Sequence, residues 1–460
     1  MNQTDSNTYY FENSPIWKAI AHMSLPMMLG MCLGVVYSLV DTFFIGKLNQ
    51  TQMLSAVALA LPFMTIQMAI GNVFGVGGGT YISRLLGEKK HDEAKTVSSV
   101  TFYFSLIAGL LFIIICFPIL HPMLQLLGAQ GDTMQPTREF ILVLLMGSPI
   151  VIANFALGEV VRAEGASKES MYGMTISVII NIILDPILIF SCHMGVAGAA
   201  MGTVVGNICA VLYYVFYLQK KSLFLTVSPK AFKPNLEVTG GIFKIGITVL
   251  IQSLFMIVST LLLNNFSIQY GDYAVAAFGI SMRVAQISDF IGMGLFMGVI
   301  PLIAYSFTAG NIKRMKKIIQ TTSLYITVLT LIITVIIMIF RTQVIEFFSK
   351  DPQVIHVGVI TLAAFLISSL FVSLSGLFIG IFQGTGREKE ASILSMVEGV
   401  LLIPTMIAGN IFWGLYGVIW SITIAQVITC IIGFGLWIRF TKDPSMKDPA
   451  LKAQNNFVIN

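Results

Sequence analysis

Charged residues are scarce in this chain of 460 residues. Only 11% are Asp, Glu, Lys or Arg, whereas average soluble domains contain about 25%. Hydrophobic residues make up 56% of the chain, and the mean hydropathy is +0.85. So few charges cannot cover the surface of a soluble protein of this length. The composition therefore predicts a polytopic membrane protein and excludes most soluble enzymes and nucleic-acid-binding proteins.

Signatures of catalysis and of metal binding are also missing. No Walker A, HExxH or GxSxG motif occurs, and the five histidines have no ligand spacing. The cysteines stand singly in or beside apolar segments, which excludes a disulfide framework or a zinc site; they are Cys32, Cys116, Cys192, Cys209 and Cys430. We therefore expect a protein that is not an enzyme and needs no cofactor, so an ion gradient must drive any work it does.

Twelve segments are long and apolar enough to span a membrane as helices, each of which needs about 20 apolar residues. They are residues 17–46, 52–82, 97–119, 138–161, 170–191, 196–218, 242–269, 274–304, 318–340, 354–380, 391–410 and 415–438. No other stretch is long enough to form a soluble domain. The sequence thus predicts an all-α polytopic membrane protein with twelve transmembrane helices.

Lysine and arginine indicate how these spans are oriented, because cytoplasmic loops carry an excess of both. With the N-terminus inside, 22 of the 27 Lys and Arg residues lie on the cytoplasmic side. Four lie outside, namely Lys47, Arg138, Arg341 and Lys350. The polar N-terminal stretch also lacks the basic segment of a signal peptide. We expect both termini to be cytoplasmic, and this bias accounts for the net charge of +5 without a nucleic-acid partner.

An internal repeat divides the chain into two six-span halves, residues 1–228 and 229–460. The aligned segments are RAEGASKES (162–170) with QGTGREKEA (383–391), residues 79–95 with 301–317, and GVAGAAMGT (195–203) with GLYGVIWSI (414–422). Six is an even number, so both lobes have one orientation and are related by a pseudo-two-fold axis along the membrane normal. Such repeats favour alternating access in a transporter over a duplicated channel or membrane enzyme.

Six ionisable residues lie inside the predicted spans, where a charge costs about 2.5–3.5 kcal/mol on insertion scales and therefore indicates function. They are Asp41, Glu159, Asp185, Asp289, Glu398 and Arg283. The excess of acids over bases favours a cationic cargo. The alternative for Asp289, Glu398 and Arg283 is a structural ion pair, for instance between Arg283 and Glu398. The alternative for Glu159 is an acid near Arg162 that snorkels toward the cytoplasmic surface.

Depth and helical spacing bring several polar side chains to one level of the N-terminal half. At about 1.5 Å per residue from the outer ends of their spans, Asp41, Asp185 and Thr203 lie at similar depths. Asn181 and Tyr37 stand one turn from Asp185 and Asp41 on the same helix faces. This set predicts a polar pocket for a proton or a bare cation, and the alternative is a hydrogen-bond network that only orders the helices.

Two prolines inside spans are candidate hinges, because proline removes a helix hydrogen bond and bends the helix. Pro26 lies in the span that carries Asp41, and Pro186 directly follows Asp185.

Three stretches of the sequence resemble the multidrug and toxic compound extrusion (MATE) family, in particular its bacterial drug exporters. They are SLPMMLGMCLGVVYSLVDTFFIGKL (24–48), GVGGGTYISRLLGEKK (75–90), and the elements RAEGA, NIILDPILIF and GVAGAAMGT within 162–203. The resemblance extends over essentially the whole chain. It implies a twelve-helix, two-lobed antiporter that exchanges cationic, amphipathic drugs for protons or sodium ions.

The resemblance also assigns residues. It maps the family's cation site, which holds H⁺ or Na⁺, onto Asp41, Asn181, Asp185 and Thr203, with Tyr37 beside them. Some members add an Asn from span four, where this chain offers Asn154 or Glu159. Members that couple through the C-terminal lobe use an acid in span ten, whereas span ten here has none and Gln383 follows it. The candidate substrate-binding residues are Glu159, Asn154, Asp289, Gln383, Glu398 and Arg283.

Two other functions compete with drug export. A lipid-linked precursor flippase of the same superfamily would carry extra spans or several basic residues facing a central cavity, but Arg283 is the single base within the predicted spans here. An intramembrane enzyme would need a catalytic pair, which the sequence lacks. We therefore expect a monomeric exporter in the bacterial cytoplasmic membrane, with small cationic drugs or dyes and membrane lipids as its partners.

Overall fold

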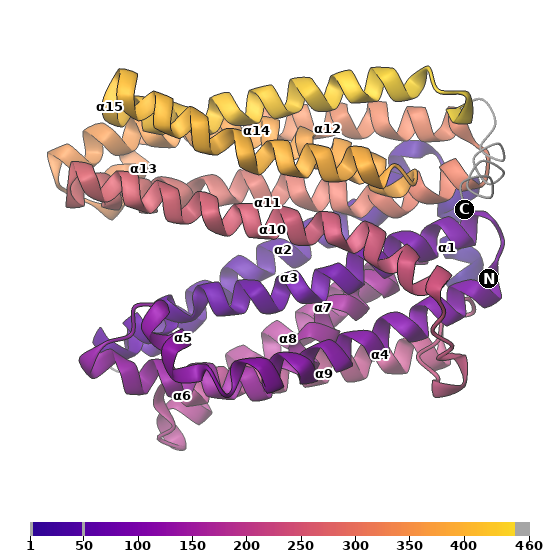
Figure 1. Ribbon diagram of the computed structural model, residues 1–460, viewed down its shortest axis with the longest axis horizontal. Coiled ribbons are helices and arrows are strands. Elements are labelled where there is room, and N and C mark those ends of the chain that lie inside the picture. The colour runs from indigo at the N-terminus through magenta and orange to yellow at the C-terminus, as the bar shows by residue number, and fades with distance from the viewer. Residues whose placement is uncertain (1–2, 48–50, 447–460) are drawn as a thin grey trace. The chain divides into compact units, whose positions relative to one another are not determined.

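The computed structural model describes residues 3–47 and 51–446, and for a few residues in these ranges, Tyr37 among them, it describes only the backbone. All regular structure in these ranges is helical, as the composition predicted (Figure 1). A helix satisfies its own backbone hydrogen bonds, which a chain that crosses lipid must do.

Long helices alternate with short ones along the chain. The first half contains α1 Gln3–Glu12, α2 Ile16–Gly46, α3 Thr51–Gly87, α4 His91–Cys116, α5 Leu120–Leu126, η1 Gly131–Thr133, α6 Met134–Met146, α7 Ser148–Ala163, α8 Ser167–Pro186, η2 Ile187–Ser191 and α9 Gly195–Lys220. Then follow η3 Pro229–Ala231, α10 Leu236–Tyr270, α11 Asp272–Thr308, α12 Ile312–Ile339, α13 Arg341–Phe348, α14 Pro352–Gly384, α15 Glu388–Thr441 and η4 Pro444–Met446.

The described helices supply the twelve predicted spans. Ten of them are long and apolar enough to cross a membrane, and the bent pair α6–α7 forms an eleventh span. α15 contains two spans, because its 54 residues would extend about 80 Å at 1.5 Å per residue, far more than the hydrocarbon core of about 30 Å. The chain reverses within it at Gly414, whose φ is +57°. The prediction of twelve transmembrane helices is therefore confirmed.

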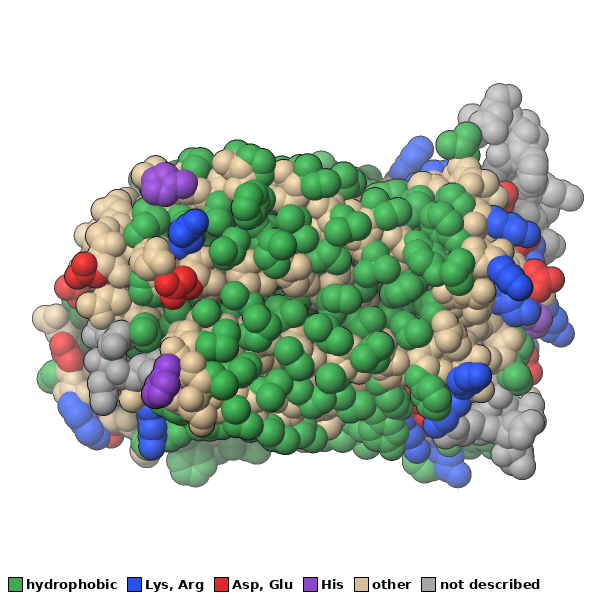
Figure 2. Space-filling view, turned by 90° about the horizontal axis from the view of Figure 1, so that it is seen from below, with side chains coloured by type: hydrophobic (Ala, Val, Ile, Leu, Met, Phe, Trp, Pro, Cys, Tyr) green, Lys and Arg blue, Asp and Glu red, His purple; other side chains and the backbone are tan. Residues whose placement is uncertain are grey.

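Large hydrophobic side chains cover the sides of the long helices. Ile114 and Ile115 on α4 and Ile332 and Ile336 on α12 are between 49% and 66% exposed. Figure 2 shows hydrophobic side chains along the middle of one face, with Lys, Arg, Asp and Glu gathered toward both ends. Exposed apolar surface flanked by charge is what a lipid bilayer requires of a spanning protein.

Span four is broken, which the sequence did not predict. α6 and α7 meet at Gly147 with an angle of 57° between them, where a single span over 138–161 was expected. A side chain at Gly147 would collide with Val204 of α9. The missing side chain at the bend therefore lets α9 pack closely against it. The buried Gln67 of α3 donates to the Leu144 carbonyl (3.0 Å) and to the Ser148 hydroxyl (2.7 Å), and so satisfies groups at the break.

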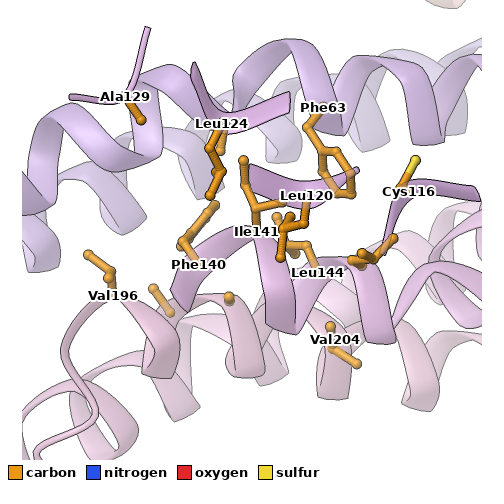
Figure 3. Close-up of a cluster of buried hydrophobic side chains, with 14 of the residues drawn as sticks. Phe63, Cys116, Leu120, Leu124, Ala129, Phe140, Ile141, Leu144, Val196 and Val204 are labelled. Carbon is orange, nitrogen blue, oxygen red and sulfur yellow. The ribbon is translucent and has the colours of Figure 1, made fainter. Parts of the chain in front are cut away.

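A hydrophobic core surrounds this break. Phe63, Leu120, Ile141 and Leu144 point toward one another from α3, α5 and α6 (Figure 3). All four side chains are at least 93% buried. The core fixes α3, α4, α6 and α9 together, and α9 carries part of the candidate site described below.

Glycines allow α3 and α7 to pack closely. Gly71, Gly75 and Gly79 recur every fourth residue and so form one stripe along α3. A methyl group at any of the three would approach α7 to within 2.7–2.9 Å. Small residues at this spacing let membrane helices bring their backbones together.

The backbone repeats at the aligned turns of the two halves. Gly165 and Gly386 occupy equivalent positions of the RAEGASKES and QGTGREKEA segments and have φ of +88° and +72°. Gly195 and Gly414 open the GVAG and GLYG segments, and both have φ of +57°. A left-handed conformation at the same positions supports the internal repeat inferred from the sequence.

The described chain forms two compact units. One contains the residues up to Phe11 together with Leu29–Leu250, and the other contains Glu12–Met28 together with the residues from Ile251 onward. Each unit therefore includes the first part of the helix that opens the other half, α2 or α10.

Candidate functional site

The centre of the candidate site is Asp185, near the end of α8. Its side chain is fully buried, and Asn181, one turn earlier, is 2% exposed. The Asn181 amide nitrogen donates to Asp185 Oδ2 at 2.9 Å. The Asn181 oxygen accepts from the Thr203 backbone N–H at 2.8 Å and lies 3.2 Å from the Thr203 hydroxyl. The structure thus brings together three of the predicted residues, from α8 and α9.

Gly202 makes room for the Asp185 carboxylate. A methyl group at Gly202 would lie 2.5 Å from Asp185 Oδ1 and 3.2 Å from the Asn181 amide oxygen. α9 can therefore approach α8 closely only because this position has no side chain. The GVAGAAMGT segment includes Gly202 directly before Thr203, so one short stretch supplies both the space and a polar contact.

Asp41 contributes a second carboxyl from α2. Its side chain is 8% exposed, and its charge acts on Asp185. Asp41 Oδ1 is buried and has no hydrogen-bond partner among the described residues. An unpartnered carboxylate oxygen beside another buried acid creates a strong demand for a positive charge. The Tyr37 side chain, which the sequence placed beside Asp41, lies outside the described residues.

A polar network extends from Asp185, through Asn181 and Thr203, to α7. Asn207, 8% exposed on α9, donates to the Thr203 carbonyl at 2.7 Å and accepts from the Asn154 amide at 2.6 Å. Asn154 Oδ1 is buried without a partner among the described residues. Sequence reasoning missed Asn207, although it stands four residues after Thr203 on the same helix face. Of the two span-four candidates, Asn154 therefore connects to the site.

Glu159, the other span-four candidate, forms an ion pair with Arg162 on the same helix. The Arg162 side chain is 3% exposed and that of Glu159 is 14% exposed. Gly75 of α3 leaves the space that the Glu159 side chain fills. Arg162, near which the sequence placed Glu159, is thus its ion-pair partner.

The helix changes form directly after Asp185. Pro186 ends the α-helical part of α8, and η2, Ile187–Ser191, continues as a π-helical turn. π-Helical turns inside helices are frequently found at functional sites. The backbone of η2 packs against α9 at Gly198, where a methyl group would lie 2.8 Å from Leu188. The carboxyl of Asp185 therefore sits at the boundary between two helix types.

In the second unit, the two acids that the sequence singled out, Glu398 and Asp289, have different neighbours. Glu398 of α15 accepts from Gln252 of α10 and from Gln426 of α15, each at 3.3 Å. Asp289 of α11 is half-buried, and its Oδ1 has no hydrogen-bond partner among the described residues. Arg283 is exposed, and no ion pair joins it to Glu398 in the described part of the chain. The suggested Arg283–Glu398 pair was therefore wrong, because two glutamines occupy that place. Gln383 is 3% exposed at the end of α14.

Outside the spans, one acid is buried in the turn between α7 and α8. Burial raises the pKa of Glu164 to about 7, although hydrogen bonds from Ser222 and Tyr217 oppose the shift. The Ser222 hydroxyl donates to Glu164 Oε2 at 2.6 Å. Ser222 begins the connection between α9 and α10, so Glu164 fixes the start of that connection.

The first unit thus presents two acids, an amide and a hydroxyl from α2, α8 and α9. Carboxylate, carbonyl and hydroxyl oxygens are the ligands that hard cations prefer. The same carboxyls can bind a proton, since two neighbouring buried acids repel each other when both are ionised. No group of three His, Cys, Asp or Glu residues suited to a transition metal occurs among the described residues.

A comparison with known protein families matches each half of the chain separately. The family model described as MatE matches residues 26–187 and again 245–408. The multidrug export protein MepA of Staphylococcus aureus strain MRSA252 is 40% identical over 439 residues, which cover 95% of this chain and 97% of that protein. The MepA protein of Staphylococcus haemolyticus strain JCSC1435 is also 40% identical and covers 95% of this chain and 98% of its own length.

Solved structures are similar over nearly the whole chain. A crystal structure of a MATE protein in complex with MaL6 superposes with a TM-score of 0.88, is 25% identical, and covers 94% of this chain and 98% of its own. A MOP superfamily transporter from Pyrococcus furiosus has a TM-score of 0.89 at 25% identity, with 94% and 97% covered. The relatives are named as export proteins rather than enzymes.

Proposed function

This chain belongs to the multidrug and toxic compound extrusion (MATE) family, and on that premise we propose that it is a secondary active exporter. It exchanges cationic, amphipathic drugs for H⁺ or Na⁺ by alternating access. The names of its MepA relatives, which are multidrug export proteins, support the drug substrates. The excess of acids over bases inside its spans supports their positive charge.

The observation that carries the coupling proposal is the pairing of Asp41 and Asp185. Two buried carboxyls with one unpartnered oxygen are costly to leave ionised and without a cation. A proton or a Na⁺ ion held by Asp41, Asn181, Asp185 and Thr203 removes that cost. The free energy of the protein then depends on whether the ion is present, and such linkage is what couples an ion gradient to a conformational change.

Asn207 and Asn154 connect the proposed ion site to α7 by hydrogen bonds. The network from Asp185 through Asn181, Thr203 and Asn207 reaches Asn154, which has an unpartnered oxygen. We propose that Asn154 senses the state of the acids and contributes to drug binding. Pro26 and Pro186 are the proposed hinges, and the π-helical turn after Pro186 supports that role.

The remaining candidate substrate residues have different surroundings. Arg283 is exposed on α11, so it is accessible to a substrate in the described structure. Glu159 would have to separate from Arg162 before it could bind a cationic drug. The others are buried or half-buried, and drug contact requires a change of packing there; they are Asp289, Glu398 and Gln383.

We further propose a monomer in the bacterial plasma membrane with both termini in the cytoplasm, in contact with membrane lipids. The distribution of Lys and Arg supports this orientation. The chain itself is a multi-pass membrane protein.

Transport by purified protein in liposomes tests the proposal. Ethidium movement is followed under an imposed proton gradient and, separately, under an imposed sodium gradient. We expect one gradient to drive the dye, and we expect Asp41→Asn and Asp185→Asn each to abolish that coupling. Asp92→Asn is the matched control, because its side chain is 99% exposed on α4.

Two results would contradict the proposal. Coupled transport at the unmodified rate in Asp185→Asn would exclude the coupling role of the acid pair. No dye movement under either gradient would exclude drug export and would favour a lipid-linked precursor flippase, for which lipid translocation is then measured.

A further inference from the structure

A half-buried acid in the second unit lies outside the proposed coupling site. Glu398 lies ten residues into α15, roughly 15 Å along the helix. Its two carboxylate oxygens are each met by one amide nitrogen, Oε2 by Gln252 Nε2 and Oε1 by Gln426 Nε2, both at 3.3 Å. Three different membrane spans therefore converge on one carboxyl.

The surroundings of Glu398 are uncharged. The groups placed against it are the two glutamine amides from α10 and the second span of α15, and no ion pair joins it to another residue in the described ranges. The next residue, Gly399, packs against the Phe255 ring of α10, so α10 and α15 are in close contact beside Glu398. An ionised carboxylate in such a place has hydrogen-bond donors but no compensating positive charge.

Glutamines suit a carboxyl that changes its protonation state. A carboxylate can only accept hydrogen bonds, whereas a carboxylic acid also donates one. A carboxamide offers both a donor and an acceptor, so it can satisfy either form by rotating. Gln426 Oε1 is buried and has no partner among the described residues, so an acceptor for the acid proton is already present.

The internal repeat places this cluster in the same three spans as the coupling site. Asp41, Asp185 and Thr203 belong to the first, fifth and sixth spans of their half, and Gln252, Glu398 and Gln426 belong to the first, fifth and sixth of theirs. Gln426 also aligns with Asn207 when the alignment of the GLYG and GVAG segments is continued by four residues. In each half an acid of the fifth span thus accepts from an amide, Asp185 from Asn181 and Glu398 from two glutamines, although the acid stands at a different turn.

We propose that Glu398 is a second proton-binding site of this protein, with Gln252 and Gln426 as its positioning residues. A hydronium ion transfers its proton to the carboxylate and leaves as water, the new O–H donates to Gln426 Oε1 after that amide rotates, and Gln252 continues to donate to the other oxygen. When the proton leaves, Gln426 rotates back, and both glutamine amides again donate to the carboxylate. The site does not depend on drug export, and only its use in coupling rests on the proposed function.

Infrared difference spectroscopy between acidic and basic pH tests the site directly. The protein is reconstituted with Asp41 and Asp185 both replaced by Asn, which removes the coupling acids from the spectrum. We expect the subtraction of the Glu398→Gln spectrum to leave one carboxylic-acid band that titrates with pH. Gln426→Leu, which keeps the carboxyl but removes its acceptor, is expected to move the frequency and the midpoint of that band.

The control is Glu346→Gln, because Glu346 is exposed on α13. Subtraction of its spectrum isolates the carboxyl band of Glu346, and Gln426→Leu should not change the frequency or the midpoint of that band. A Glu398→Gln subtraction without any titrating carboxyl band would overturn the proposal. So would a band that Gln426→Leu leaves unchanged in both frequency and midpoint. Because the background variant lacks the coupling acids, a failure of the export proposal leaves this result intact, and the two failures are distinguishable.

Discussion

At the scale of single residues, the absence of a side chain at Gly202 matters as much as the carboxyl that it faces. Gly202→Ala would place a methyl group 2.5 Å from Asp185 Oδ1, so the carboxylate must move. Strain of this kind costs about 1–3 kcal/mol, which corresponds to roughly 5–150-fold weaker ion binding. We expect the ion concentration needed for half-maximal dye transport to rise by such a factor in liposomes.

Gly34→Ala is the matched control for that measurement. Gly34 lies on α2, the helix that carries Asp41, and a methyl group there meets nothing within 4 Å. Its ion dependence should match that of the unmodified protein. Equal behaviour of the two alanine variants would show that Asp185 has no part in ion binding.

The acids of the candidate site could be predicted from the sequence, whereas their hydrogen-bond partners could be predicted only in part. Asp41, Asn181, Asp185 and Thr203 follow from depth and helix faces, because these depend on local spacing. Asn207 was within reach of the same reasoning, since it lies one turn after Thr203. The contact of Asn154 with Asn207, and that of Glu398 with two glutamines, depend on which helices are neighbours, and that requires the tertiary structure.

At the scale of helices, glycines again set the contacts. α2 packs against α11 where Gly294 and Gly298, four residues apart, face Met28 and Ser24, and the Ser24 hydroxyl donates to the Leu295 carbonyl at 3.0 Å. Methyl groups at the two glycines would lie 2.8 Å and 2.6 Å from the α2 backbone. This contact flanks Pro26, so one of the proposed hinges lies inside a tightly packed segment of α2.

We expect Gly298→Ala to destabilise the protein, because the added methyl group forces α11 away from α2. The cost of such overpacking is about 1–3 kcal/mol. Gly279→Ala, on the same helix with nothing within 4 Å, is the control and should be neutral or slightly stabilising. The thermal unfolding midpoints of the detergent-solubilised variants test this, and Gly298→Ala should unfold at a lower temperature than Gly279→Ala. Equal midpoints would show that the α2–α11 contact at Gly298 does not contribute to stability.

Hydropathy identified the spans well, because a bilayer imposes length and apolarity on each of them. It did not identify the break of span four. Gly147, Ser148 and Pro149 are a helix-breaking combination, but membrane helices tolerate such residues when neighbours satisfy the freed groups. Gln67, which does this here, lies on another helix, and only the folded structure reveals it.

At the scale of the whole molecule, Glu164 links stability to pH. Its pKa is raised from 4.5 to about 7 by burial, so the folded protein binds this proton more tightly than the unfolded chain does. Stability from this group is full below pH 4.5 and is lost as pH rises through about 7, a change of about 3 kcal/mol. Glu164→Gln, which cannot ionise, should therefore unfold at a higher temperature than the unmodified protein at pH 8 and at nearly the same temperature at pH 5.

Thermal unfolding at the two pH values measures this difference. Glu88→Gln is a suitable control, because Glu88 lies at the surface in the neighbouring turn between α3 and α4. Parallel pH profiles for Glu164→Gln and the unmodified protein would refute the link between Glu164 and stability.

The orientation of the whole chain is testable by cysteine labelling. In a background in which the five native cysteines are replaced, Arg341→Cys should react with an impermeant reagent in intact cells, whereas Lys313→Cys should react only after permeabilisation. Both positions are exposed, so access to the protein surface does not differ. The reverse pattern would place the termini outside the cell.

The division of α2 and α10 between the compact units has a consequence for biosynthesis. Glu12–Met28 leaves the ribosome early, yet the unit in which it packs is otherwise made from Ile251 onward. The first part of α2 therefore completes its packing only after more than half of the chain has been translated and inserted. Neither half contains all the residues of one compact unit, so each half needs the other to complete its packing.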